Sequence, residues 1–474
     1  MGLITKIKRW FELKFLSKAK EDFKINPITS EDMTAFINRC LTIYQGKPPW
    51  LDSEEHIKTI NFAKSICSET ARLATLAISI KITGSKRAEW LQEQIDDAYY
   101  QIRDWVEYGC ASGTVILKPS LDGIDVMTPD RFAVTNQRNG KITGAVFADS
   151  VPDETGERFY TRLEYHRFLD DGIYAVSNRC YIGNSEYDTS KPIKIGFTPW
   201  KGLLEDVYIE NIKKPLFGVF KTPQANNINF NSPLGMPIFA DAVQELKDLD
   251  IAYSRNAKEI FDSKRTVLID SDRMMMYGGA IPTNSAECEI ARTNMGLPDM
   301  VKNVMGSGTE SFYQEINPSL HTDERLTGLN SLLSQIGYKC GFSNGYFVFN
   351  EKTGLTTATQ VEADQQRTIQ FIKDVRDKIE DAIKGVVYAL NALADLYNLA
   401  PAGTYNEEEM IHCADITYSF EEERLHHYNL AMQGRFPWEE YYVRFLKYSR
   451  EEAQELLRKA AEANKTPSLF GLEE

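Results

Sequence analysis

The segment with the clearest chemical potential is GFSNGYFVFNEKTGLTTATQVEAD, residues 341 to 364, in which glycines precede a cluster of threonines and a predicted helix. A glycine-rich loop ahead of a helix can bind phosphate, because the first backbone N–H groups of the helix point at the anion. A nucleotide-binding loop also needs a lysine before its final Ser or Thr, and no lysine follows Gly354. The threonines instead predict helix caps, as two capping boxes: Thr359 with Glu362, and Thr357 with Gln360.

A second candidate is a metal site in IHCADITYSFEEERLHHYN, which holds His412, Cys413, Asp415, His426 and His427. Zinc ligands usually come in paired spacings that close a tetrahedron, and two adjacent histidines do not turn easily to one ion. We therefore interpret these residues as solvated side chains. The G-x-S-x-G spacing of a hydrolase elbow occurs in GFSNG, residues 341 to 345, but this match follows a predicted helix and not the strand that such an elbow requires. The sequence predicts no catalytic residue, no metal and no cofactor, and hence a protein that is not an enzyme.

The 474 residues are enough for more than one compact unit, and 42% hydrophobic with 26% charged residues is typical of a globular protein. No apolar run is long enough to span a bilayer, so no membrane partner is expected. A formal charge of −14 argues against tight binding of nucleic acid. Seven scattered cysteines without a CxxC pair indicate reduced thiols in the core.

The first twenty residues carry six Lys or Arg and one acidic residue, with interleaved apolar positions. They lack the apolar block of a signal peptide. A basic amphipathic helix here could lie on a membrane or an acidic partner, but we favour an outer helix docked on its own domain.

The elements that follow change from helices to strands. We expect a helix capped by Ser53 and a second helix over 86 to 108 that Gly109 ends. From 113 onward, alternating segments separated by Asp122-Gly123, Asn139-Gly140 and Asp171-Gly172 predict an antiparallel sheet of hairpins.

The second half is dominated by long helical patterns. Residues 238 to 264 and 322 to 341 predict two helices joined by a segment of short strands and loops, 265 to 319. A third pattern over about 357 to 397 predicts a helix of roughly 60 Å. The tail, 401 to 474, holds 15 acidic and 8 basic residues and ends in a helix that begins at Ser449.

Four stretches resemble the portal proteins of tailed bacteriophages, especially long-tailed phages of Gram-positive hosts. They are YTRLEYH (160 to 166), ENIKKPLFGVFKTPQANNINFNSPLGMPIFADA (210 to 242), YQEINPSL (313 to 320) and KCGFSNGYFVFNEKTGLTTATQV (339 to 361). The likeness keeps this order from IKRWF near the N-terminus to ITYSFEEE, so it covers most of the chain. Its central block is the specific part.

The resemblance implies an α+β, mainly helical portal fold. Its parts would be a wing (1–237), stem helix 1 (238–264), a clip (265–319), stem helix 2 (320–341), a channel loop (342–356), a long wing helix (357–400) and a crown (401–474). It also implies a ring of twelve copies at one capsid vertex of a virion, assembled in the host cytoplasm, through which DNA is packaged and ejected.

In such rings the channel loop narrows around the DNA duplex. The candidates for DNA contact are therefore Asn344, Tyr346, Phe347, Phe349, Asn350 and Lys352. In an alternative arrangement the aromatic residues anchor the loop against neighbouring subunits, and only polar tips meet DNA. The implied partners are the terminase large subunit, the head-completion adaptor, the major capsid and scaffolding proteins, and double-stranded DNA. The alternative function is a ring enzyme that processes nucleic acid or nucleotide.

Overall fold

The computed structural model describes residues 15–51, 57–76, 78–120, 123–262, 266–270, 300–304, 313–316, 321–348, 358–407, 410–413, 427–446, 448 and 450–463. The fold is a mixture of helices and mainly antiparallel sheets, which agrees with the α+β class. The chain divides into two compact units. The first comprises Met1–Thr75 with Ile80–Ile411, and the second comprises Leu76–Ser79 with His412–Glu474. Among the described residues, no helix is long and apolar enough to cross a membrane.

The first unit begins with helices. They are α2 (Leu16–Phe23), α3 (Glu31–Tyr44), α4 (Phe62–Thr75), α5 (Lys86–Tyr100) and α6 (Ile102–Ser112). Helix α3 is capped at its N-terminus by Ser30, whose side chain accepts a hydrogen bond from the Met33 N–H at 3.2 Å. The predicted cap at Ser53 lies outside the described residues, but the prediction of a helix that begins there was wrong, because residues 57–61 are not helical and α4 begins at Phe62.

The prediction of one helix over 86 to 108 was wrong in two respects. The helix breaks at Gln101, which leaves helical geometry at φ −94° and ψ 12°. Gly109 lies inside α6 rather than after it. A glycine is needed there to make room for Phe220, because an added Cβ would come within 2.3 Å of the Phe220 ring. The residue that ends α6 is Gly113, at φ +85°.

Two antiparallel sheets follow. The smaller has the order β10-β2-β3, with β2 Thr114–Ser120, β3 Gly123–Met127 and β10 Gly218–Lys221. The larger has the order β4-β5-β6-β7-β8, with β9 also paired to β7. Its strands are β4 Phe132–Arg138, β5 Lys141–Pro152, β6 Phe159–Phe168, β7 Tyr174–Gly183, β8 Lys191–Ile193 and β9 Asp206–Ile209.

The predicted hairpins are confirmed at the turns that the structure describes. Asn139 and Gly140 both have positive φ, 52° and 73°, which is the geometry that twisted two-residue hairpins favour. Gly172 has φ +81° between β6 and β7. Asp122 lies outside the described residues.

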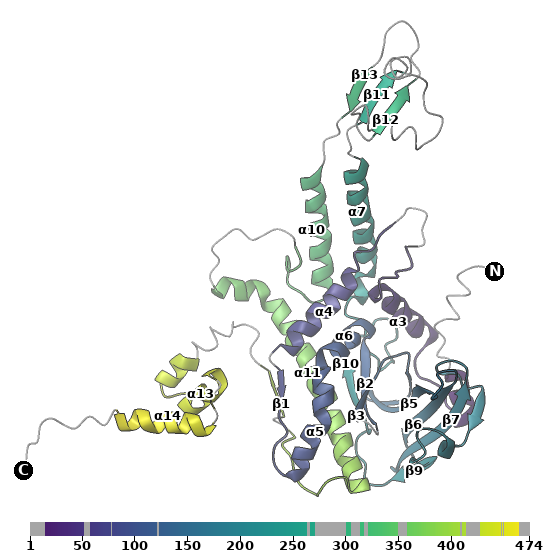
Figure 1. The fold of residues 1–474 in the computed structure, drawn as a ribbon, viewed down its shortest axis with the longest axis vertical. Helices are drawn as coiled ribbons and strands as arrows, with labels where there is room; N and C mark the ends of the chain where they lie inside the picture. Colours follow the sequence, from purple (N-terminus) through teal and green to yellow (C-terminus); the bar gives the residue numbers. More distant parts are fainter. Residues whose placement is uncertain are drawn as a thin grey trace, which may run out of the picture. The chain divides into compact units, whose positions relative to one another are not determined.

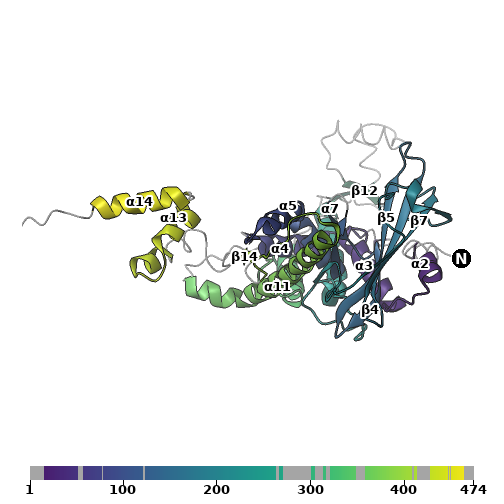
Figure 2. The same ribbon diagram turned by 90° about the horizontal axis from the view of Figure 1, so that it is seen from below.

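Successive side chains of β5 are buried on opposite faces of the larger sheet, and α2 and α3 lie on opposite sides of this sheet (Figure 2). Val146 and Ala148 pack with Ala19 of α2, whereas Ala145 and Phe147 pack with Met33 of α3 and with the smaller sheet. This is the period of two that a strand imposes. The larger sheet is therefore covered on both faces.

Helix α11 (Ala358–Tyr397) crosses the smaller sheet at a contact that only glycine permits. A Cβ on Gly218 of β10 would lie 2.0 Å from the Ala382 carbonyl oxygen, and a Cβ on Gly385 would lie 2.8 Å from the Gly218 Cα. Glycines at such points let backbones approach closely.

Helices α7 (Val243–Asp262) and α10 (Thr322–Lys339) form an antiparallel pair (Figure 1). Two ion pairs tie their opposite ends: Glu245 with Lys339, at 2.5 Å, and Glu259 with Arg325. The sequence placed the first helix start at 238, but α7 begins at Val243 after the short helix η2 (Ala240–Ala242). Ile238 is fully buried and its N–H donates to the Cys110 carbonyl, so the core holds this residue outside the helix.

Between α7 and α10 lies a small sheet of β11 (Thr266–Asp270), β12 (Met300–Val304) and β13 (Tyr313–Ile316). Strand β11 is central, parallel to β12 and antiparallel to β13. Short strands in this segment are thus confirmed for the part of it that the structure describes.

In the second unit, helix α13 (Trp438–Leu446) packs on α14 (Arg450–Ala463). Tyr441 lies in an aromatic cluster, with its ring 5.7 Å from Trp438 and 5.4 Å from Phe445. The predicted last helix is confirmed in α14. Two short strands, β1 (Ile78–Ile80) and β14 (Ile411–Cys413), pair with each other.

Candidate functional site

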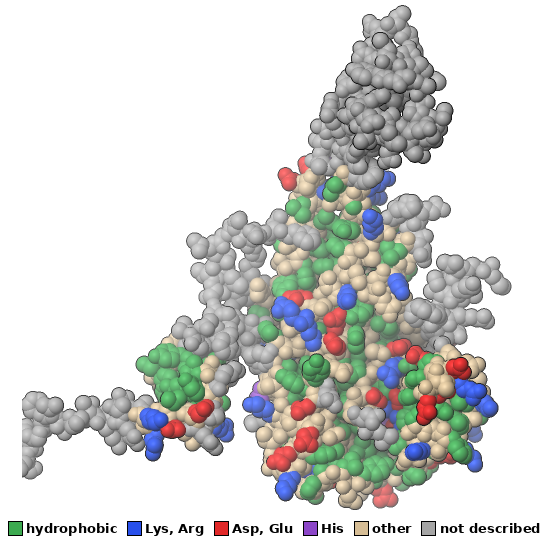
Figure 3. All heavy atoms as spheres, in the orientation of Figure 1, with side chains coloured by type: hydrophobic (Ala, Val, Ile, Leu, Met, Phe, Trp, Pro, Cys, Tyr) green, Lys and Arg blue, Asp and Glu red, His purple; other side chains and the backbone are tan. Residues whose placement is uncertain are grey.

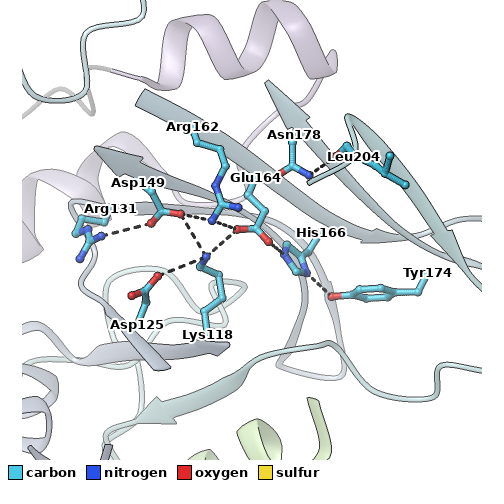
Figure 4. Close-up of polar contacts among 10 residues, drawn as sticks. All are labelled: Lys118, Asp125, Arg131, Asp149, Arg162, Glu164, His166, Tyr174, Asn178 and Leu204. Carbon is cyan, nitrogen blue, oxygen red and sulfur yellow. Dashed lines mark hydrogen bonds and ion pairs between the residues drawn. The ribbon is translucent and has the colours of Figure 1, made fainter. Parts of the chain in front are cut away.

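A cluster of buried charges lies where the two sheets meet (Figure 4). The Lys118 ammonium of β2 lies 2.7 Å from Glu164 of β6 and 3.3 Å from Asp149 of β5. The Arg162 guanidinium bridges the same two carboxylates, at 2.6 Å from Asp149 and 3.0 Å from Glu164. Lys118 is 1% exposed, and the other three are also buried. We call these four residues the charge cluster.

A hydrogen-bonded chain continues from the charge cluster into the core. His166 Nε2 lies 2.9 Å from Glu164 Oε1, and His166 Nδ1 lies 2.9 Å from the Tyr174 hydroxyl. That hydroxyl accepts a hydrogen bond from the Leu216 N–H at 3.0 Å. Every link is a specific polar contact, as buried polar groups require.

The protonation states fit ion pairing rather than acid–base chemistry. Burial pushes the pKa of the Glu164 carboxyl upward, but the charges of Lys118 and Arg162 outweigh it and hold the pKa well below its usual range. Burial lowers the pKa of Lys118, and the charges of Glu164 and Asp149 more than reverse this, so the pKa is raised. A charged lysine is no base and an ionised glutamate is no acid. The charge cluster joins β2 to β5 and β6 and serves the fold.

Sequence reasoning missed the charge cluster, although a signal was present. In β6, Arg162, Glu164 and His166 alternate with Leu163 and Tyr165. Charges on one face of a strand usually indicate a solvated face. Here that face meets Lys118 of the other sheet, and only the packing of the two sheets shows this.

No alternative chemical site appears among the described residues. They contain no group of three or more His, Cys, Asp or Glu side chains that could hold a metal. From the proposed set, His412 is exposed and the His427 ring packs on Phe436 and Phe445, while Asp415 and His426 lie outside the described residues. Within the described part of the chain, five cysteines are free and buried, and burial raises the pKa of the Cys40 thiol to about 12. Such thiols are unreactive core residues.

The first residues of the predicted channel loop, 342 to 348, belong to a turn over 340 to 348 that packs against helix α4. The Tyr346 hydroxyl donates to Glu69 at 2.5 Å. The Phe347 ring meets Phe62 edge-on at 5.2 Å and Phe342 at 4.7 Å. Both aromatic side chains are half-buried within their own chain.

In contrast to the two aromatic side chains, the Asn344 side chain is exposed. Its side-chain oxygen accepts a hydrogen bond from the Ser334 hydroxyl of α10. The three remaining candidates, Phe349, Asn350 and Lys352, lie outside the described residues. The structure thus brings Asn344, Tyr346 and Phe347 into one turn and separates the polar residue from the aromatic pair.

Two open grooves flank Asn344. One, of about 870 Å³, lies between α7, α10 and the turn; the other, of about 670 Å³, lies between the turn, the end of α10 and α11. The first is lined mainly by hydroxyl and amide side chains, namely Thr327, Asn330, Ser331, Ser334, Gln335 and Asn344. On the face shown in Figure 3, uncharged side chains also cover most of α7 and α10.

The cations of these grooves already have partners. Lys339 is paired with Glu245, and the Arg367 guanidinium stacks 3.9 Å over the Tyr338 ring while donating to the Tyr338 carbonyl. A phosphate site needs converging cations or free N–H groups. The surface therefore offers weak, uncharged polar contacts.

No protein-family model matches the chain, and no curated protein matches it. Among solved structures, it is similar to a chain from the virion of a native gene transfer agent particle, with 11% identity and a TM-score of 0.37, over 79% of this chain and 89% of that one. It is also similar to a chain from the neck of a native gene transfer agent particle computed with C12 symmetry, with 10% identity and a TM-score of 0.38, over 94% of this chain and 99% of that one. Both TM-scores are low, so the proposal below rests on residues of this chain.

Proposed function

We propose that this chain is a portal protein of a tailed-phage-like particle, one subunit of a ring through which double-stranded DNA is packaged and ejected. The observation that carries the proposal is the order of elements after residue 237. The strands of a small sheet lie in sequence between the two antiparallel helices, α7 and α10. After α10 come an aromatic turn and then the 40-residue helix α11. This order coincides with the stretch in which the sequence resembles portal proteins. In that scheme α7 and α10 are the stem, and the sheet between them belongs to the clip.

The charge of the chain suits a conduit for DNA. Twelve copies at −14 each carry −168 in total. An acidic assembly repels phosphates, so a duplex would slide through without being held. The grooves beside Asn344 fit the same requirement, since their cations, Lys339 and Arg367, already have partners within the chain and are not free to hold the DNA backbone.

Within the channel loop, we propose that polar tips meet DNA and that Tyr346 and Phe347 position them. The half-buried aromatic pair supports this division, as does the exposure of Asn344. Asn350 and Lys352 complete the proposed DNA-facing set, with Phe349 as a further anchor. Replacing Asn344, Asn350 and Lys352 together by alanine should reduce DNA packaging or retention. Unchanged packaging and retention would contradict a channel role for the loop.

The clip is proposed to bind the terminase large subunit during packaging and then the head-completion adaptor. ATP hydrolysis would belong to the terminase, which agrees with the missing lysine after Gly354. The ring would sit at one capsid vertex of the virion, in contact with the major capsid and scaffolding proteins, after assembly in the host cytoplasm.

A deletion experiment tests the proposal. In cells that produce the particle, removal of the coding sequence should give capsids without DNA, and supplying the chain from a plasmid should restore DNA-filled particles. DNA-filled particles that lack the chain would contradict the proposal. The purified chain should also show no ATP hydrolysis above background with or without DNA, whereas clear hydrolysis would favour the ring-enzyme alternative.

A further inference from the structure

The loop over residues 222 to 238 returns on itself and is fixed at its base. The Thr222 hydroxyl donates to the Met236 carbonyl at 2.6 Å, and the Gln224 amide donates to the Ile238 carbonyl at 3.0 Å. Higher up, the Asn226 amide donates to the Leu234 carbonyl at 3.3 Å. Three side chains thus hold the two arms of the loop together.

The tip of this loop is also ordered by side-chain contacts. The Asn226 side-chain oxygen, Oδ1, accepts hydrogen bonds from the N–H groups of Ile228 and Asn229, at 3.0 and 2.9 Å. The Gln137 amide of β4 donates to the Asn231 carbonyl at 2.7 Å. Asn side chains that bind nearby backbone groups stabilise one loop conformation.

The rigid tip displays an aromatic side chain to solvent. Phe230 is 88% exposed, and its neighbour Ile228 is 38% exposed. Residues 232 to 240, which follow directly, are all buried. A single exposed apolar residue needs no explanation, but a phenylalanine on a loop that several hydrogen bonds hold in place is pre-organised for binding.

The loop has no charge in a strongly charged chain. Residues 222 to 240 contain no Asp, Glu, Lys, Arg or His, whereas the whole chain has 68 acidic and 54 basic residues. Without a cation the tip cannot hold phosphates tightly, which argues against DNA as its partner. Protein interface cores are depleted of charges and enriched in aromatic residues, which describes this tip.

We propose that Phe230, with Ile228, docks on a second copy of this chain. The proposal rests on the ring function proposed above. In a closed ring each copy uses two different surface patches, one to contact the next copy and the other to contact the preceding copy. Copies with a net charge of −14 each repel one another. A contact between two copies is therefore most favourable at a surface without charges, because no unpaired charge is then buried. The uncharged tip meets that condition.

A photo-crosslinking amino acid placed at position 230 of the full-length chain tests the contact directly. Irradiation of the assembled protein should join two copies, and the peptide attached to position 230 should map to one fixed site on the neighbouring chain. Cross-links within the same chain only, cross-links only to added lipid vesicles or another protein, or no cross-links in assembled rings would overturn the proposal.

Substitution provides the second test. Phe230→Glu should raise the concentration at which half of the chains are assembled by at least about tenfold, while Phe230→Tyr should stay near wild type. Because the side chain is exposed, neither change should alter folding of the single chain, which thermal unfolding checks. The matched control is Phe197→Glu, which adds the same charge in place of an aromatic residue that is 74% exposed and lies in sequence between Lys194 and Lys201. Equal assembly of Phe230→Glu and wild type, or an equal defect in Phe197→Glu, would overturn the proposal.

The outcomes separate this inference from the ring function. Rings without cross-links from position 230 would remove the inference and leave the ring. Joined pairs of copies without any ring would keep the Phe230 contact and remove the proposed function. A chain that stays monomeric without cross-links would remove both.

Discussion

At the scale of single residues, the charge cluster is the feature whose disruption should cost the fold the most stability. Removing one partner of a buried ion pair leaves an uncompensated charge, which costs about 3–5 kcal/mol of stability. Lys118→Met should therefore lower the free energy of unfolding by about that amount, as measured by urea denaturation. The double variant Lys118→Met/Glu164→Leu should recover part of the loss, because both charges leave together.

The control for this prediction is Lys378→Met. Lys378 pairs with Asp381 at 3.2 Å, with side chains 39% and 64% exposed. An exposed pair contributes at most about 1 kcal/mol, so the control should unfold almost as the wild type does. A Lys118 variant as stable as this control would contradict a structural role for the charge cluster.

The same cluster predicts a dependence of stability on pH. The pKa of Glu164 is well below its usual range in the folded chain, so the unfolded chain binds a proton at this group more readily. The stabilisation by Glu164 is therefore present above about pH 4.3 and is lost as the pH falls through the folded pKa. Burial raises the pKa of Asp125, which acts in the opposite direction, so the wild type must be compared with Glu164→Gln. The difference in unfolding free energy between them should shrink as the pH falls below about 4.3, and a constant difference would contradict this account.

At the scale of elements, the aromatic turn should be held by α4 and not by the sheets. Phe347→Ala removes the ring contacts with Phe62 and Phe342 and should cost about 1–3 kcal/mol of local stability. Hydrogen exchange should become faster for peptides that cover 341 to 348 and stay unchanged for β5 and β6. Asn344→Ala is the control, because this side chain is exposed. Equal exchange in the two variants would contradict anchoring by Phe347.

Sequence patterns predicted elements well where the determining signal is local. The hairpin at Asn139-Gly140, the two helices of the antiparallel pair and the long helix α11 all follow from neighbouring residues. Sequence patterns failed where the local structure depends on a residue far away in the sequence. The prediction that Gly109 ends a helix was wrong because this glycine makes room for Phe220, a residue more than one hundred positions later in the chain. The charge cluster was missed for the same reason, since Lys118 and Glu164 belong to different sheets.

The candidate channel loop could be located from sequence, but not the directions of its side chains. Asn344, Tyr346 and Phe347 are almost adjacent in sequence, yet only Asn344 is exposed. Tyr346 is turned inward by Glu69 of a helix some 280 residues earlier. The predicted capping boxes at the start of α11 fall on residues whose side chains lie outside the described part of the chain.

At the scale of the whole molecule, the net charge should control assembly. Copies with a charge of −14 repel one another, and salt screens this repulsion as the Debye length falls from about 30 Å at 0.01 M to about 8 Å at 0.15 M. Raising the salt concentration over that range should lower the concentration at which half of the chains are assembled, as sedimentation velocity can measure. Assembly that weakens with salt would show that ion pairs between copies dominate instead.

The central claim, that this chain forms a conduit ring, is tested most directly by electron microscopy of the purified full-length chain over a range of concentrations. The account predicts closed rings with a central hole, whose native mass is a whole multiple of 54.0 kDa. A strict monomer at every concentration, or a closed assembly without a central channel, would contradict it.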